Sequence, residues 1–198
     1  MGLILEYDDG QTPLDEEEKV GLLIPAISTR GELDEFEQQN IETAVQWTLS
    51  RKFSSDQVFT ADFTRNLHKR MYGQVWAWAG DFRKSDKNIG VHWPAIPTNS
   101  KQLLDDAIFW HANQTYSPDE IAIRFKHRLV SIHCFPNGNG RHSRLMADII
   151  IEKLYGQSVF TWGAKNLSKD SDLRKEYISS LKKADQGNYT SLLSFARS

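Results

Sequence analysis

The sequence predicts a mainly α-helical domain that carries one small β-hairpin. Apolar residues recur at helical intervals along most of the chain, and residues typical of helix N-caps precede several of these stretches. One stretch, residues 76–97, is instead broken by glycines and prolines and includes the β-prone "NIGVHW". A chain of 198 residues is long enough to bury a core as one domain.

The first helix is expected from Glu32 to about Arg51, after a capping box made by Thr29 and Glu32. Its apolar residues at broadly helical spacing are Leu33, Phe36, Ile41, Val45 and Leu49. A second helix is expected over Ala61–Tyr72. The glycine- and proline-rich segment then predicts a loop and the small hairpin.

Helix resumes near Ser100 and continues to Asn113. Ser117 and Pro118 then provide an N-cap and a first-turn proline for a helix that ends near Ile132. The remaining helices are expected from within "NGNGR" to about Gly156, over residues 173–184 and over residues 189–196. Together they predict a helical bundle.

Residues 1–29 are expected to form an N-terminal arm, and residues 30–198 a single globular domain. The arm lacks the basic start and long apolar core of a secretion signal, and no segment has the roughly eighteen consecutive apolar residues that a membrane helix needs. The formal charge of -2 argues against a nonspecific grip on nucleic acid. We therefore expect a cytoplasmic protein with no membrane or nucleic-acid partner.

The stretch "HCFPNGNGRHSR", residues 133–144, carries the chemistry. A helix that starts near Asn139 leaves its first N–H groups unpaired, and Gly138 and Gly140 let an anion approach that backbone. Arg141 and Arg144 are three residues apart, so both can face the same anion. His133, at the end of the preceding helix, is a suitable general base for a hydroxyl.

These residues resemble the motif of Fic domains, with matches at His133, Phe135, Gly138, Asn139, Gly140, Arg141 and Arg144. "LHKRMYGQVWAWAGDFR", "NIGV" and the tail "YISSLKKADQGNYTSLLSFA" are similar to further parts of the family. The resemblance covers about residues 30 to 197 and is closest to the subgroup called mobile mystery protein B. It implies a Fic-type helical bundle with a β-hairpin flap.

The resemblance also implies an activity: transfer of AMP, or another nucleotide monophosphate, from ATP or another NTP to a Ser, Thr or Tyr hydroxyl of a target protein. His133 and Arg141 would be catalytic. The phosphates would contact Gly138, Asn139, Gly140, Arg141 and Arg144. Phe135 would anchor the loop in the core, and Mg²⁺ would accompany the phosphates.

For partners, the resemblance implies an unidentified target protein and a separate inhibitor protein. The target segment would dock on the flap residues Asn88, Ile89, Gly90 and Val91. Trp93, in the predicted hairpin, would either contact the target or be buried against the domain. Ser28 and Glu32 have the spacing of the family's inhibitory helix, although Leu33 departs from the pattern and the capping box already explains Glu32.

Two positions depart from the family motif. Cys134 replaces a common proline, which we expect packing to tolerate. Asn137 replaces the acid that would bind Mg²⁺, and a neutral amide is a poorer ligand for a hard cation. The alternatives are therefore a nucleotide- or phosphate-binding scaffold with little catalysis, or transfer of another phosphorylated group. An HNH-type nuclease fits less well, because His133 closes a helix instead of lying on a strand.

Overall fold

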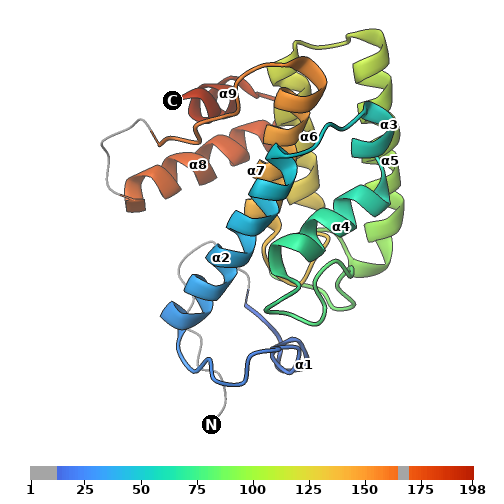
Figure 1. Ribbon diagram of the computed structural model, residues 1–198. Helices are drawn as coiled ribbons and strands as arrows, with labels where there is room; N and C mark the ends of the chain where they lie inside the picture. The colour runs from blue at the N-terminus through green and yellow to red at the C-terminus, as the bar shows by residue number, and fades with distance from the viewer. Residues whose placement is uncertain (1–12, 165–169) are drawn as a thin grey trace.

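The computed structural model describes residues 13–164 and 170–198, so the first twelve residues of the expected arm lie outside the described residues. Two helices, α6 (Pro118–Ile132) and α7 (Asn139–Ile149), pack against each other at the centre of the bundle (Figure 1). Helix α5 (Ile96–Asn113) packs on α6, and α4 (Ala61–Tyr72) packs on α7. The mainly helical prediction is confirmed.

The other elements surround this centre. Helix α2 (Arg30–Leu49) packs on α4, and α8 (Asp170–Asp185) packs on α9 (Thr190–Arg197), on the side away from α3 and α5 (Figure 1). The short elements are α1 (Glu16–Lys19), α3 (Ser55–Val58), the 3₁₀ turn η1 (Trp93–Ala95) and the π-helical turn η2 (Ile150–Leu154), which extends α7.

The predicted helix caps are confirmed. The Thr29 side chain accepts a hydrogen bond from the Glu32 N–H, and the Glu32 carboxylate accepts one from the Thr29 N–H at 3.0 Å. At α6 the Ser117 side chain accepts a hydrogen bond from the Glu120 N–H, and Pro118 is at the first helical position. These contacts satisfy N–H groups that a helix start leaves without an intrahelical partner.

The predicted β-hairpin is not found: no β-strand forms within residues 13–164 and 170–198. Leu22 and Trp76 pair only through a single antiparallel bridge. In the expected flap, the Arg83 guanidinium binds the carbonyls of Ser85 and Val91, while Asp86 accepts the Trp93 N–H. Because side chains occupy these backbone groups, a strand ladder does not form there.

The end of the same segment is also different from the prediction. Residues 93–99 were expected as loop, but η1 and the first turn of α5 occupy them. Pro94 and Pro97 lie in the first turns of these elements. Proline is tolerated there because first-turn N–H groups have no intrahelical partner.

The buried side of α2 is unexpectedly polar. The predicted apolar residues Phe36 and Leu49 are exposed, whereas the buried residues are Leu33, Glu37, Asn40, Ala44 and Thr48. The Asn40 side chain donates to the Arg70 carbonyl and accepts from the Gln74 N–H. Helix α2 is thus held by specific polar contacts as well as by apolar burial.

The described part of the arm packs on the domain. Leu14 and Ile27 belong to the hydrophobic core, and the Leu23 N–H donates to the Val75 carbonyl. The division of the chain at residue 29 stays a prediction. None of the helices within the described residues combines the length and the apolar character needed to cross a membrane.

Candidate active site

The stretch 133–144 forms a turn between the two central helices. Helix α6 ends at His133, which has a left-handed backbone (φ 57°), and α7 begins at Asn139. The buried Arg83 side chain fixes this turn, because its Nε donates to the His133 carbonyl at 2.6 Å. Its Nη1 donates to the Ser85 carbonyl at 2.7 Å. One guanidinium therefore ties the end of α6 to the loop that follows Arg83.

The inside of the turn is closely packed. Phe135 is fully buried, as expected, and stacks on His68 with ring centroids 3.7 Å apart. His68 Nδ1 accepts the Gly80 N–H, so Nε2 is the nitrogen that donates to the Asn137 carbonyl at 3.0 Å. The Asn139 side chain accepts from the Phe135 N–H and donates to the Phe135 carbonyl. Since both ends of this buried amide bond to Phe135, the side chain holds the turn in place, while the backbone N–H of Asn139 stays available to a phosphate.

The two glycines of the helix tip differ in their surroundings. Gly138 has φ +77°, and a Cβ there would lie 2.5 Å from the Tyr72 ring, so the fold itself requires glycine. A Cβ on Gly140 would meet no atom within 4 Å, and Gly140 has no positive φ. Packing therefore gives no reason for glycine at residue 140. Open space above a helix tip is instead what an incoming anion needs.

The N–H groups of the helix tip are also suited to binding an anion. Within the described residues, the N–H groups of Asn139, Gly140 and Arg141 make no hydrogen bond to a backbone carbonyl, and the first intrahelical bond runs from His142 to Gly138. Unpaired amides and the helix dipole together attract negative charge.

Arg141 is held by α2. Its Nη2 lies 2.6 Å from Glu37 Oε2, while Glu37 Oε1 accepts the Trp76 indole N–H at 2.7 Å. The Arg141 guanidinium also lies over the Tyr72 ring, 5.2 Å from its centroid. About a third of the Arg141 side chain stays exposed (32%), whereas Glu37 is buried. Arg141 opens into a hollow of about 530 Å³ whose other lining residues are Asp34, Glu35, Gln38, Gln39 and Glu42.

Arg144 has a different environment. Among the described residues it forms no hydrogen bond or ion pair, and its guanidinium lies 5.6 Å from the centroid of the Tyr177 ring. The buried Lys126 contacts the same ring and the Tyr177 hydroxyl. Burial, together with the charge of Arg144, holds the pKa of Lys126 well below its ordinary value. Arg144 therefore makes no direct ion pair with a described carboxylate. Burial raises the pKa of the nearby Asp148, and the charge of Arg144 acts to lower it.

His133 is nearly buried, with 5% of its surface exposed. Burial is the main reason that the pKa of His133 falls to about 4, and the positive charge of Arg83 lowers this pKa further. A hydrogen bond to the Val130 backbone opposes the shift. Nδ1 is inaccessible to solvent, so only Nε2 can accept a proton from an outside hydroxyl. The imidazole is thus neutral at physiological pH.

The loop expected to be the flap covers this histidine. A Cβ on Gly90, where φ is +101°, would lie 2.6 Å from His133 Cβ. Val91 donates its N–H to the Ile132 carbonyl and accepts from Arg83. The backbones of Asn88, Ile89 and Gly90 make no hydrogen bond to another described residue.

The residues near the helix tip do not form a cation site. Asn137 Oδ1 accepts the Gly138 N–H at 2.6 Å, so this oxygen is turned back onto the turn. No cluster of three or more His, Cys, Asp or Glu side chains that could hold a metal occurs within the described residues. The donors present therefore do not fit Mg²⁺.

Two other expected positions lie apart from the motif arginines. The Glu32 carboxylate accepts hydrogen bonds from Ser28 and Thr29 at the start of α2, and these bonds lower its pKa. Cys134 is buried beside Ser100, and burial raises the pKa of its thiol to about 11. Cys134 is thus a packing residue at this pH.

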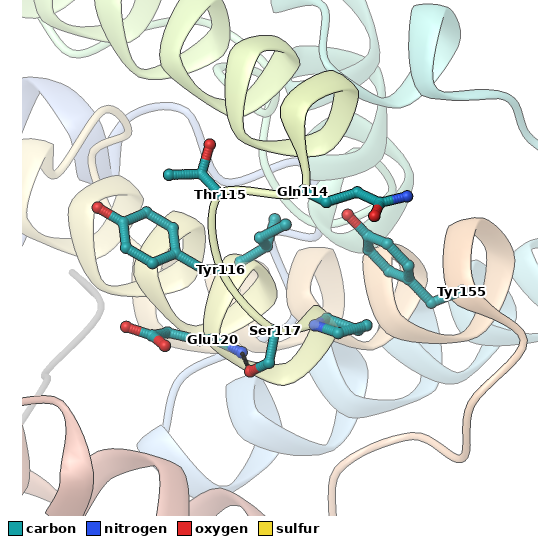
Figure 2. Close-up of a pocket in the computed structure, with 8 residues that line it drawn as sticks. Gln114, Thr115, Tyr116, Ser117, Glu120 and Tyr155 are labelled. Atoms are coloured by element: carbon teal, nitrogen blue, oxygen red, sulfur yellow. Dashed lines mark hydrogen bonds between the residues drawn. The ribbon is translucent and has the colours of Figure 1, made fainter.

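A hollow of about 620 Å³ lies near the connection between α5 and α6, lined by residues that include Gln114, Tyr116 and Tyr155 (Figure 2). It lies beside the start of α6, whereas His133 ends that helix. The fifteen residues of α6 separate the two by roughly 22 Å. This hollow contains none of the motif residues.

Three buried side chains that organise the turn were not identified from the sequence: Arg83, Glu37 and His68. Arg83 and Glu37 are 50 and 104 residues from their partners in the turn and in α7. A charged residue at an otherwise apolar helical position would have been the available signal for Glu37, since α2 buries it between Leu33 and Asn40.

The fold and the turn define a helical domain in which an open, positively polarised helix tip lies beside a neutral histidine. Residues 58–151, which include this turn, match the model of the Fic/DOC family. Together with the similarities below, this match confirms the predicted resemblance to Fic domains over residues 58–151. Membership of the mobile mystery protein B subgroup is not confirmed by these comparisons.

The relatives are distant. Protein adenylyltransferase Fic of Drosophila melanogaster is 28% identical over 133 residues, which cover 65% of this chain and 25% of that protein. The protein of the same name from Nematostella vectensis is 25% identical over 130 residues, covering 64% of this chain and 30% of that protein. The chain thus spans about a quarter of the length of the curated relatives that it matches.

Solved structures share the fold. Fic-1 of C. elegans (aa134–508) has a TM-score of 0.68 at 22% identity, covering 90% of this chain and 51% of that one. BepC of Bartonella tribocorum, with bound AMPPNP, has a TM-score of 0.68 at 16% identity and covers 92% of this chain and 97% of that one. At these identities the likeness shows the fold alone.

Proposed function

We propose that this chain is a Fic-type transferase that moves AMP, or another nucleotide monophosphate, from a nucleoside triphosphate to a hydroxyl of a target protein. The observation that carries the proposal is the helix tip: N–H groups at Asn139–Arg141 make no backbone hydrogen bond, Gly140 has open space around it, and one short turn joins this tip to His133. Relatives named protein adenylyltransferase support the same reaction class.

In this reaction, His133 Nε2 accepts the proton of the target hydroxyl while the hydroxyl oxygen bonds to the α-phosphorus. The bond from the α-phosphorus to the bridging oxygen breaks, and pyrophosphate leaves. The backbone N–H groups of Gly140 and Arg141, with the Arg141 and Arg144 guanidiniums, stabilise the charge of the leaving group. Arg144 has no direct ion pair within the described residues to break before it binds phosphate, although its charge also acts on Asp148.

The target segment would bind the loop over His133. The backbones of Asn88, Ile89 and Gly90 are unpaired, and the Ile89 side chain is exposed. An extended peptide can pair with such a backbone largely independently of its sequence. Val91 would lie in the docking loop without pairing with the target backbone, because its N–H and carbonyl already have partners. Trp93, also exposed, is a further contact.

A second candidate is a nucleotide-binding scaffold with little turnover. The Asn137 amide favours it, because this side chain is neutral and bonded to Gly138. Transfer of another phosphorylated group is a third reading of the same geometry. Any Mg²⁺ would then arrive with the nucleotide's phosphates and not on a protein carboxylate.

One labelling experiment separates the three. The protein is incubated with cell lysate and ATP labelled on the α- or the γ-phosphate, beside the His133→Ala and Asn137→Asp variants. Protein-bound α-label that disappears in His133→Ala supports nucleotidyl transfer, and γ-label alone indicates phosphoryl transfer. If only Asn137→Asp transfers label to protein, the natural chain binds nucleotide without useful transfer. No label in any variant, together with no ATP binding, rejects the proposal.

An inhibitory role for Glu32 stays a prediction. It requires the Glu32 carboxylate to leave the cap of α2 and reach a motif arginine. Glu32→Gly should then increase labelling. Unchanged labelling in a folded Glu32→Gly protein would leave Glu32 with its capping role alone.

A further inference from the structure

The Asn137–Gly138 pair places a backbone nitrogen against the side-chain amide of the preceding residue. Gly138 N lies 2.6 Å from Asn137 Oδ1, so the nitrogen of residue 138 is folded against the side-chain amide of residue 137. Gly138 has no Cβ to hinder the approach of its nitrogen to the Asn137 amide carbon. The Asn137 side chain is half-buried, so water can reach it.

A second Asn–Gly pair two residues later is held differently. Asn139 is buried (4% exposed), and its amide is held from both ends by Phe135, with distances of 2.9 and 2.8 Å. Both Asn139 and Gly140 lie in the first turn of α7. Within four consecutive residues, one Asn–Gly pair has its glycine nitrogen against the asparagine amide, and the other has its asparagine amide held by Phe135.

We propose that Asn137 is a site of spontaneous deamidation. The Gly138 nitrogen bonds to the Asn137 Cγ and loses its proton, the bond from Cγ to the amide nitrogen breaks, and ammonia leaves. Water then opens the five-membered succinimide to give aspartate or isoaspartate at residue 137. No oxidant, reductant or enzyme takes part, and the turn itself supplies the nucleophile.

The reaction changes the charge of the helix tip. A neutral amide next to Gly138 becomes a carboxylate, a hard oxygen ligand that repels phosphate unless a divalent cation lies between them. The aspartate product would therefore make nucleotide binding depend on Mg²⁺. In the isoaspartate product the backbone runs through Cβ and Cγ of residue 137, one carbon longer than before, and the carbonyl that His68 holds becomes part of a free carboxylate. This consequence rests on the proposed function, whereas the chemical step does not.

The chemical step is tested on the full chain by ageing it in mildly alkaline buffer and mapping its peptides by mass spectrometry. Deamidation adds about 1 Da. The expected gain is at residue 137 and not at residue 139 while the chain is folded, and at both residues in urea. Asn137→Gln is the matched control, since its longer side chain does not favour the five-membered ring. Equal protection of both asparagines in the folded chain, or faster reaction at Asn139, overturns the proposal.

The consequence is tested by ATP binding with and without Mg²⁺. Fresh wild-type protein should bind with little response to Mg²⁺, and Asn137→Asp should bind at least about tenfold more tightly with Mg²⁺ than without it. Equal Mg²⁺ dependence in the two proteins overturns this half of the proposal. If neither protein binds ATP, the proposed function fails, while a mass gain confined to residue 137 still establishes the modification site.

Discussion

The burial of His133 leads to a quantitative prediction about its protonation. A pKa of about 4 in the folded chain lies about 2.5 units below the ordinary value near 6.5, which corresponds to about 3.4 kcal/mol in favour of the neutral ring. At about pH 5.5, roughly 97% of His133 should therefore be neutral, compared with about 9% of an ordinary histidine.

Histidine titration followed by NMR measures this directly, with the His133 signals assigned from their absence in His133→Ala. The same signals in the urea-unfolded chain should titrate near the ordinary value and serve as the control. If the proposed reaction occurs, the acid limb of kcat/KM should follow the folded value, because kcat/KM reports the free enzyme's base. A folded His133 that titrates near 6.5 would refute the burial argument.

The same burial affects stability. His142 is also buried, with a pKa of about 4, because burial disfavours its charged form. Since the folded pKa values of His133 and His142 lie below the unfolded value, the unfolded chain gains protons first as the pH falls. The contribution of these two neutral rings to the free energy of unfolding is complete above about pH 6.5. It falls towards pH 4, by up to about 3 kcal/mol for each ring. Denaturant melts at several pH values measure this loss, and a melt that stays constant down to about pH 5 would contradict it.

Further predictions concern the helix tip and its support. Gly138→Ala should destabilise the fold by at least about 1–2 kcal/mol in urea melts, because of its positive φ and the Tyr72 ring. Gly140→Ala, the matched control, should leave stability unchanged and weaken ATP binding. Equal unfolding midpoints in urea for Gly138→Ala and Gly140→Ala would contradict the expected difference in stability. Glu37→Ala should lower the free energy of unfolding by about 1–3 kcal/mol, because it leaves the buried Trp76 N–H unpaired. Glu35→Gln is the control, and equal urea melts for these two variants would refute the expectation.

Much of the helical framework could be predicted from local patterns. The Thr29–Glu32 capping box and the Ser117–Pro118 start of α6 depend on neighbours within three or four residues. The β-hairpin prediction was not confirmed: no strand forms in its segment, which is shaped by Arg83 and Asp86 contacts that local β-propensity does not include. Local propensity is regularly overridden where tertiary contacts satisfy the backbone.

The motif itself could be recognised from the sequence because its residues are close together in the chain. Glycines, a helix start and two arginines three residues apart specify an open helix tip through local geometry alone. The ion pair that holds Arg141 at this tip could not be predicted from the sequence, since its partner Glu37 is 104 residues away in the chain.

The sequence by itself determined the helices, their caps and the chemical groups of the turn, because these depend on contacts between residues a few positions apart. Only the tertiary structure decided that α2 buries a polar stripe, that Glu37 and Trp76 hold Arg141, and that Arg83 fixes the end of α6 at His133. It also decided the protonation of His133, because desolvation depends on everything that surrounds the ring and not on its neighbours in the chain.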